Sequence, residues 1–211
     1  MMDPVSPTRS ELLAKRAQIK LAQQGRDLLK EKRTALWKEL MKTVDQALRY
    51  TATLEENVAD ARRALALAQA FDGREAVQSA AFAAKRNVTI DVTATNVVGV
   101  QIPEIERKTL VRSSLERGYS LASASSRIDT TALRFEQVLE QVIELAAIEL
   151  RLRRLAEEIR KTTVRVNALD MVLLPRLQAE RAAIERVLDE REREDLFRLK
   201  RVKARIDTNS V

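Results

Sequence analysis

Two long segments of this sequence carry apolar or threonine residues at spacings that alternate between three and four. In the second segment the unbroken run is Leu145, Ile148, Leu152, Leu155, Ile159, Thr162, Val166, Leu169 and Leu173. In the first segment it is Leu40, Val44, Ala47, Thr51, Leu54, Val58, Ala61, Leu65 and Ala68, and the same phase continues upstream through Leu12, Ile19, Ala22, Leu29 and Leu36. This spacing places each set in one stripe along a helix, which is the pattern of a coiled-coil seam.

The composition agrees with two long helices joined by a thin apolar seam. Charged residues make up 33% of the chain and aromatic residues 3%, with only 4 glycines and 4 prolines. Such a chain favours long helices over a thick globular core. The predicted fold is therefore mainly α, with an antiparallel two-helix coiled coil formed by an N-terminal helix within residues 1–71 and a C-terminal helix within residues 131–211.

The connecting segment, residues 72–130, is predicted to contain a small β-hairpin. Residues 88–102 read VTIDVTATNVVGVQI, in which β-branched residues alternate with polar ones at both ends. The Thr-Asn-rich centre at 93–96 is the expected turn, and Pro103 is expected to end the ladder.

Pro175 lies inside the second helical run, where proline normally costs about 3 kcal/mol because it lacks an N–H and clashes with the carbonyl four residues earlier. The seam phase slips by one residue between Leu173 and Leu177, so a local bend or supercoil change is expected there. If Arg9 lies near position 207 in the antiparallel pair, Pro175 faces the region of Trp37 and Leu40.

Several classes of function lack the residues they need. The chain has no cysteine and no histidine, which excludes disulfides, thiolate nucleophiles and imidazole chemistry. The glycines are isolated, so there is no phosphate-binding loop, and no metal or cofactor site is predicted. No apolar run approaches the roughly 20 residues of a membrane span, and the N-terminus lacks a signal-peptide pattern. A non-catalytic cytoplasmic protein is expected.

The charges are concentrated near the C-terminus. Residues 189–196 hold five acids and two arginines, and residues 198–205 hold five basic residues and no acid. Such a band is either a solvated helix with i,i+4 ion pairs or a tip that binds an oppositely charged partner. The candidate partner-binding residues are Arg9, Lys15, Arg16, Arg191, Arg198, Lys200, Arg201 and Lys203.

Both ends of the chain resemble the D subunit of the V-type and archaeal-type ATPases/ATP synthases. The matching motifs are SPTR at 6–9, AQQGRDLLKEKR at 22–33, RVNAL followed by LLP at 165–175, and EREREDLFRLKRVK at 190–203. Asp170 stands where the family pattern leads us to expect glutamate. Residues 72–130 carry no matching motif.

The resemblance implies a central rotor shaft that transmits torque between ATP turnover and ion movement through the membrane. It also implies specific partners. The terminal helices would enter the hexamer of A and B subunits, the F subunit would bind lower on the shaft, and the opposite end would seat on the membrane-rotor connector (the C or d subunit). The shaft would have no active site and would lie in the cytoplasm, peripheral to the membrane.

Two other interpretations of the residues remain open. A structural coiled-coil adaptor predicts no stable assembly with A, B and F subunits. A basic coiled coil that binds nucleic acid predicts salt-sensitive binding, although acids interleave with the basic residues and no stacking aromatics accompany them.

Overall fold

The computed structural model describes residues 7–85, 87–105, 109–120 and 124–209; within the last range the side chains of residues 204 and 206–209 are not described. The elements are, in chain order, α1 (Arg9–Asp72), α2 (Arg74–Ala83), β1 (Val92–Val97), β2 (Val100–Ile105), the 3-10 turn η1 (Ser114–Glu116), α3 (Ser126–Ala168), the π-helical turn η2 (Leu169–Leu173) and α4 (Leu174–Asn209). They form two compact units, one of residues 35–159 and one of residues 1–34 with 160–211.

The long helices begin and end at local signals. The side-chain oxygen of Thr8 accepts a hydrogen bond from the Glu11 N–H at 3.2 Å, which caps the start of α1. Gly73, with φ 85°, lies between α1 and α2, and this left-handed conformation is one that glycine adopts without strain. The sequence pattern did not predict α2. The fold class is confirmed, with two long helices and a small antiparallel hairpin.

In the 35–159 unit, the predicted seam lies between α1 and α3. Ala61 and Ala68 of α1 are fully buried, and Ala68 packs with Ala80 of α2 and Ile128 of α3. A polar pair also spans the helices, because the side-chain amide of Asn57 donates to Gln141 at 3.0 Å. Polar pairs of this kind fix the register of a coiled coil at some cost in stability.

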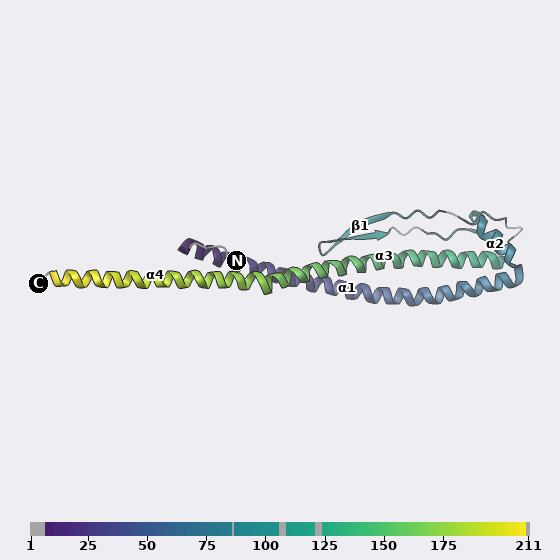
Figure 1. Cartoon of the computed structure of the whole chain (residues 1–211). Coiled ribbons are helices and arrows are strands. Elements are labelled where there is room, and N and C mark those ends of the chain that lie inside the picture. Colours follow the sequence, from purple (N-terminus) through teal and green to yellow (C-terminus); the bar gives the residue numbers. More distant parts are fainter. Residues whose placement is uncertain (1–6, 86, 106–108, 121–123, 210–211) are drawn as a thin grey trace. The chain divides into compact units, whose positions relative to one another are not determined.

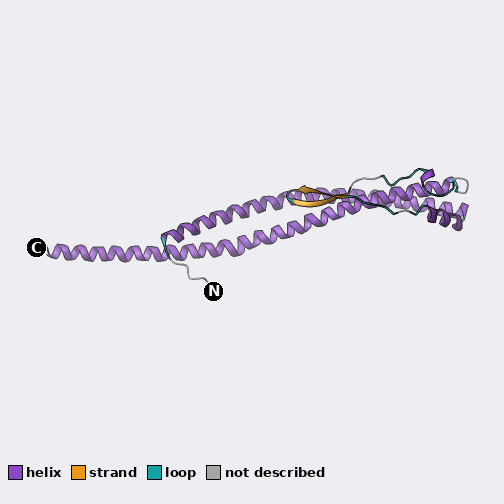
Figure 2. Ribbon diagram, turned by 90° about the horizontal axis from the view of Figure 1, so that it is seen from above, coloured by secondary structure: helices purple, strands orange, loops and turns teal. Residues whose placement is uncertain are grey.

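The hairpin beside these helices is shifted from its predicted position (Figures 1 and 2). Its strands pair from Val92 with Ile105 to Val97 with Val100, so the strands cover residues 92–105 instead of 88–102. The expected turn at 93–96 is wrong, since those residues lie in β1. The chain turns instead at Val98 and Gly99, both of which have positive φ.

Pro103 does not end the ladder, because it occupies a position where its missing N–H is not needed. Val97 and Val100 flank a two-residue turn and form a hydrogen-bonded pair, so hydrogen-bonded and non-hydrogen-bonded pairs alternate from there. By this alternation Pro103 and its partner Ala94 form a non-hydrogen-bonded pair. The nitrogen of Pro103 therefore points away from β1, and the ladder continues to Ile105.

Val98 provides a first test of this turn. A β-branched residue at φ 54° is strained, and a two-residue turn with two positive φ values favours Asn-Gly. Val98 is 42% exposed, so little burial is lost on substitution. We expect Val98→Asn to raise the free energy of unfolding by about 1 kcal/mol, measured by urea denaturation. Val98→Thr is the matched control, because it keeps the β-branch; an equal gain in that variant would contradict the strain argument.

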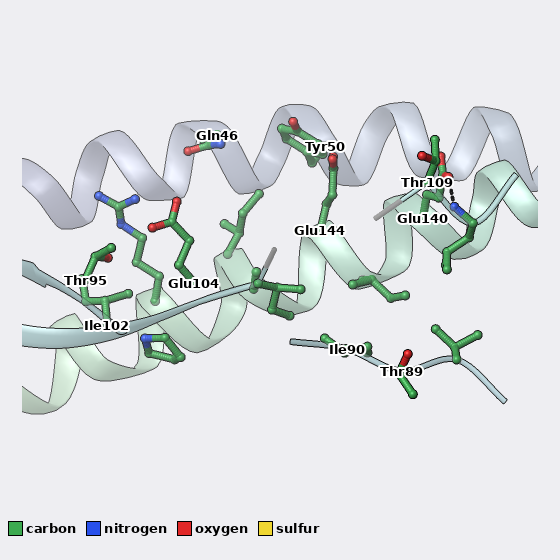
Figure 3. A pocket seen from close by; sticks show the side chains of 18 residues that line it. Gln46, Tyr50, Thr89, Ile90, Thr95, Ile102, Glu104, Thr109, Glu140 and Glu144 are labelled. Atoms are coloured by element: carbon green, nitrogen blue, oxygen red, sulfur yellow. Dashed lines mark hydrogen bonds between the residues drawn. The ribbon is translucent and has the colours of Figure 1, made fainter. Parts of the chain in front are cut away.

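The hairpin is held by an apolar cluster on its inner face. Val100 and Ile102 of β2 pack with Leu36, Leu155 and Ile159 of the helices, and all five are buried. Next to this cluster the hairpin and the helices line a half-open pocket of about 410 Å³ (Figure 3).

A second loop, which we call the strap (residues 109–119), is bound to α3 by carboxylates. Glu140 accepts the backbone N–H groups of Leu110 and Val111, and Glu136, one helical turn earlier, accepts that of Arg112 at 3.1 Å. Two glutamates on one face of α3 thus satisfy three consecutive amides of a segment that has no regular structure there.

Arg117 is the centre of this arrangement. Its side chain is 2% exposed, and its guanidinium lies 2.9 Å from Glu136 Oε2 and 2.5 Å from Asp129 Oδ1. Burial alone would raise the pKa of Glu136, but hydrogen bonds from Arg117 and Arg112 outweigh it and hold that pKa below its usual value. The strap is therefore attached by a buried ion-pair network, which the sequence pattern did not reveal.

In the unit of residues 1–34 and 160–211, α1 and α4 pack through Ile19, Leu174 and Leu177, with Ala22 beside them. The register differs from the predicted one. Arg9 pairs with Glu192 at 2.5 Å instead of lying near position 207. Pro175 is consequently next to residues that pack on Ile19 and Ala22, and the expectation that it faces Trp37 and Leu40 is wrong.

Candidate partner-binding surface and helix irregularity

The C-terminal part of α4 has no partner helix among the described residues. Arg191 donates to the backbone carbonyl of Pro7 at 3.1 Å, close to the start of α1 at Arg9. From residue 189 to residue 203 every described side chain is exposed. Both views show this part of α4 extending beyond the start of α1 (Figures 1 and 2). We call residues 194–203 the tip.

Four of the eight predicted cations join α4 to α1 or to Pro7, which lies just before α1. Lys15 lies 2.9 Å from Glu180 and is only 14% exposed, and Arg16 lies 2.8 Å from Glu185. The hydrogen bond from Lys15 is the main cause that lowers the pKa of Glu180. Together with Arg9 and Arg191, these side chains already have partners within the chain.

The other four cations lie on the tip. Arg198 makes only long contacts, at 3.7 Å to Glu194 and 3.8 Å to Asp195, and Lys200 lies 6.0 Å from the centre of the Phe197 ring. Arg201 and Lys203 are exposed, and neither has an ion pair with another described residue. These four cations are therefore the ones available for a partner.

Apolar side chains lie beside these cations, and the sequence pattern had placed two of them in the buried seam. Leu199 and Val202 were expected to end the seam, but they are 65% and 53% exposed, and Leu196 and Phe197 are 59% and 66% exposed. The spacing of Leu196, Leu199 and Val202 is that of one helix face, so the pattern predicted a buried stripe. Ile206, the last predicted seam residue, lies outside the described side chains. The tip thus combines an apolar face with free cations.

A π-helical turn lies one turn before the position where the phase slip predicted a bend, and the bend at Pro175 itself stays a prediction. The Leu174 N–H donates to the carbonyl of Leu169, five residues back, and residues 169–173 form a π-helical turn. This turn adds one residue between Val166 and the next buried position, which is Leu174. Leu173, predicted in the seam, is 40% exposed. Pro175 follows where the bonding pattern changes, and because it has no N–H it leaves no donor unpaired there.

Asp170 lies within this π-helical turn and contacts α1. Lys30 Nζ is 2.8 Å from Asp170 Oδ2, and Arg26 Nη1 is 3.4 Å from Oδ1. The hydrogen bond from Lys30 is the main cause that lowers the pKa of Asp170. Ion pairs therefore join the π-helical turn to α1, whereas the sequence pattern indicated only Pro175.

The net charge of the chain resides in one unit. Residues 1–34 and 160–211 hold 21 of the 38 Lys and Arg residues but 13 of the 31 Asp and Glu residues, a net +8; residues 35–159 hold 17 and 18, a net −1. A surface of this sign favours an acidic partner. Within the described ranges, none of the helices combines the length and apolarity that a membrane crossing needs.

These features define a class of protein with long paired helices, a small β-hairpin beside them and a terminal helix whose basic end has no partner helix among the described residues. The family model for the ATP synthase D subunit matches residues 11–204, so the chain belongs to the ATP synthase D subunit family.

Similar proteins cover nearly the whole chain. The A-type ATP synthase D subunit of Thermococcus kodakarensis is 43% identical over 206 residues, covering 98% of this chain and 96% of that protein. Its counterpart in Pyrococcus furiosus is 44% identical over 203 residues (96% and 95%), and that of Halorubrum lacusprofundi is 41% identical over 204 residues (97% and 90%). The resemblance seen at both ends of the sequence therefore extends through residues 72–130.

Proposed function

We propose that this chain is the central rotor shaft of a V/A-type rotary ATPase/ATP synthase and carries no catalytic site itself. Membership of the ATP synthase D subunit family supports a place in such a complex. One observation supports the role of the tip: the C-terminal turns of α4 extend beyond the helix pair, and they carry free cations and exposed apolar side chains. The exposed apolar side chains of such a helix end have nothing to pack against, so this end suits insertion into another protein.

In this proposal the tip enters the hexamer of A and B subunits. The F subunit binds elsewhere on the shaft, and the membrane-rotor connector (the C or d subunit) holds the opposite end. The complex lies in the cytoplasm, peripheral to the membrane. The helix packing within each unit and the ion pairs of Lys15 and Arg16 would resist twisting between these attachments. An asymmetric pair of helices would present a different face to each of three catalytic interfaces.

Reversing the charge of the tip tests the proposal. The triple variant Arg198→Glu, Arg201→Glu, Lys203→Glu is expected to weaken assembly with co-expressed A, B and F subunits by at least about tenfold, because like charges would meet across the interface. The readouts are the yield of a stoichiometric complex and its ATP hydrolysis rate.

The matched control reverses three exposed cations of α1 in the other unit, Lys38, Lys42 and Arg49. It is expected to assemble as the unmodified chain does. If the tip variant also assembled and hydrolysed ATP normally, the tip would not be the contact. If the unmodified chain failed to assemble with A, B and F subunits, a non-rotary adaptor would be the better interpretation.

A further inference from the structure

The two outer edges of the hairpin differ in chemistry. The alternation set by the turn directs the N–H and C=O groups of Thr93, Thr95 and Val97 towards β2. Those of Val92, Ala94 and Asn96 therefore point outward from β1. On the opposite edge the corresponding outward position of β2 is occupied by Pro103, which has no N–H to offer. Only β1 presents a regular row of donors and acceptors.

The β1 edge lacks the protection that natural sheets normally carry. Residues 92–97 read VTATNV, without a charge or a proline, and the strand pairs with β2 through a continuous register without a bulge. Five of its six residues are exposed, including Val92 at 60%. No third strand occurs in the described part of the chain. Unprotected edges of this kind pair readily with another strand.

The edge is also held in place for binding. Val100 and Ile102 anchor β2 in the buried cluster with Leu36, Leu155 and Ile159, so β1 is presented on a helical support. A two-stranded sheet alone is only marginally stable, and a third strand would complete it. The outward groups recur at every second residue, a spacing that an extended strand matches and a helix, with its own backbone groups already bonded, does not.

We propose that the outer edge of β1 binds an extended strand of another protein of the complex, forming a three-stranded sheet. The recognition is by backbone hydrogen bonds at Val92, Ala94 and Asn96, which explains why β1 needs no charged side chain. This inference rests on the proposed function, because it requires a complex that supplies the strand. It concerns a surface in residues 35–159, separate from the tip.

Residue-resolved hydrogen exchange tests the proposal directly. In the free chain the amides of Val92, Ala94 and Asn96 should exchange rapidly, while those of Thr93 and Thr95, bonded to β2, are protected. In the complex reconstituted with A, B and F subunits and the membrane-rotor connector, exchange of Ala94 and Asn96 is expected to slow by at least about tenfold. An active complex in which these two amides exchange as in the free chain would overturn the proposal and leave the proposed function standing.

Two substitutions of Ala94 supply the matched variants. Ala94→Pro removes an outward donor and leaves the inward bonds of β1 unchanged, as Pro103 does directly opposite. It is expected to abolish the protection at Asn96 in the complex and to weaken assembly at least about tenfold, with Thr93 and Thr95 still protected. Ala94→Val keeps the N–H and should behave as the unmodified chain.

Two further outcomes separate the alternatives. Protection of Ala94 and Asn96 in the free chain that rises with its concentration would show that a second copy occupies the edge, which overturns a heterologous partner. Assembly and protection that are equal in Ala94→Pro and Ala94→Val would show that backbone pairing is not involved. Failure of the unmodified chain to form any complex would remove the proposed function and this inference together.

Discussion

Replacing Arg117 with methionine is expected to lower the free energy of unfolding by about 3 kcal/mol, because it removes a buried cation and leaves the buried Glu136 carboxylate with Arg112 as its remaining ion-pair partner among the described residues. Glu136 is 9% exposed, and both it and Asp129 form an ion pair with the Arg117 guanidinium that the variant would remove. The strap should detach first, and the amides of Leu110 to Arg112 should exchange faster than those of α3. Urea denaturation and hydrogen exchange measure the two effects.

The matched control is Arg134→Met. Arg134 also pairs with an aspartate, Asp60, at 3.3 Å, but the two side chains are 44% and 40% exposed. Water screens such a pair, so the midpoint of unfolding should change little. A loss as large in Arg134→Met as in Arg117→Met would show that burial of the network is not what makes it important.

Deleting Met171 is expected to cost about 3 kcal/mol, because it removes the extra residue of the π-helical turn and forces Pro175 into an ordinary α-helical register. Met171 is 76% exposed, so its side chain contributes little burial. After deletion, Leu174 would follow Val166 by seven residues and remain in the seam. The cost would come from the proline ring and its missing N–H. Urea denaturation of the variant measures this loss.

The rescue experiment isolates that cause. Combining the deletion with Pro175→Ala should recover most of the lost stability, since alanine supplies the N–H that the α-helical ladder needs. Pro175→Ala alone should have a smaller effect, because the wide turn already accommodates residue 175. If the double variant were as unstable as the deletion alone, the π-helical turn would be required for a reason other than the proline.

The helical part of the fold was predictable because seam periodicity is a local property. Ile148, Leu155 and Ile159 are buried as their spacing predicted. Leu173 departs from that pattern because the π-helical turn adds its residue at 169–173, before the phase slip that the spacing placed between Leu173 and Leu177. The hairpin was recognised by its β-branched residues, but its turn was misplaced. The polar residues at 93–96 suggested a turn, and Val98, a residue that disfavours positive φ, gave no such signal.

The residues of the candidate site were predictable from the sequence, but which of them are buried or already paired was predictable only in part. The eight cations were identified from charge clustering, but sequence does not show that Lys15 is buried against Glu180 and that Lys203 is free. The apolar face of the tip was visible as a pattern, yet the same pattern also describes a buried seam. Whether a stripe is covered depends on where the partner helix begins.

The sequence by itself determined that two long helices pair through a narrow seam, because the positions that share a helix face follow from spacing alone. It also determined the family through its terminal motifs. The tertiary structure decided the register, in which Arg9 meets Glu192, and hence the part of α4 that remains uncovered. It also decided the buried network around Arg117 and the open edge of β1. The physical reason is that a heptad pattern repeats along the helix, so many registers satisfy it. Specific ion pairs, a wide turn and the strand register select one of them.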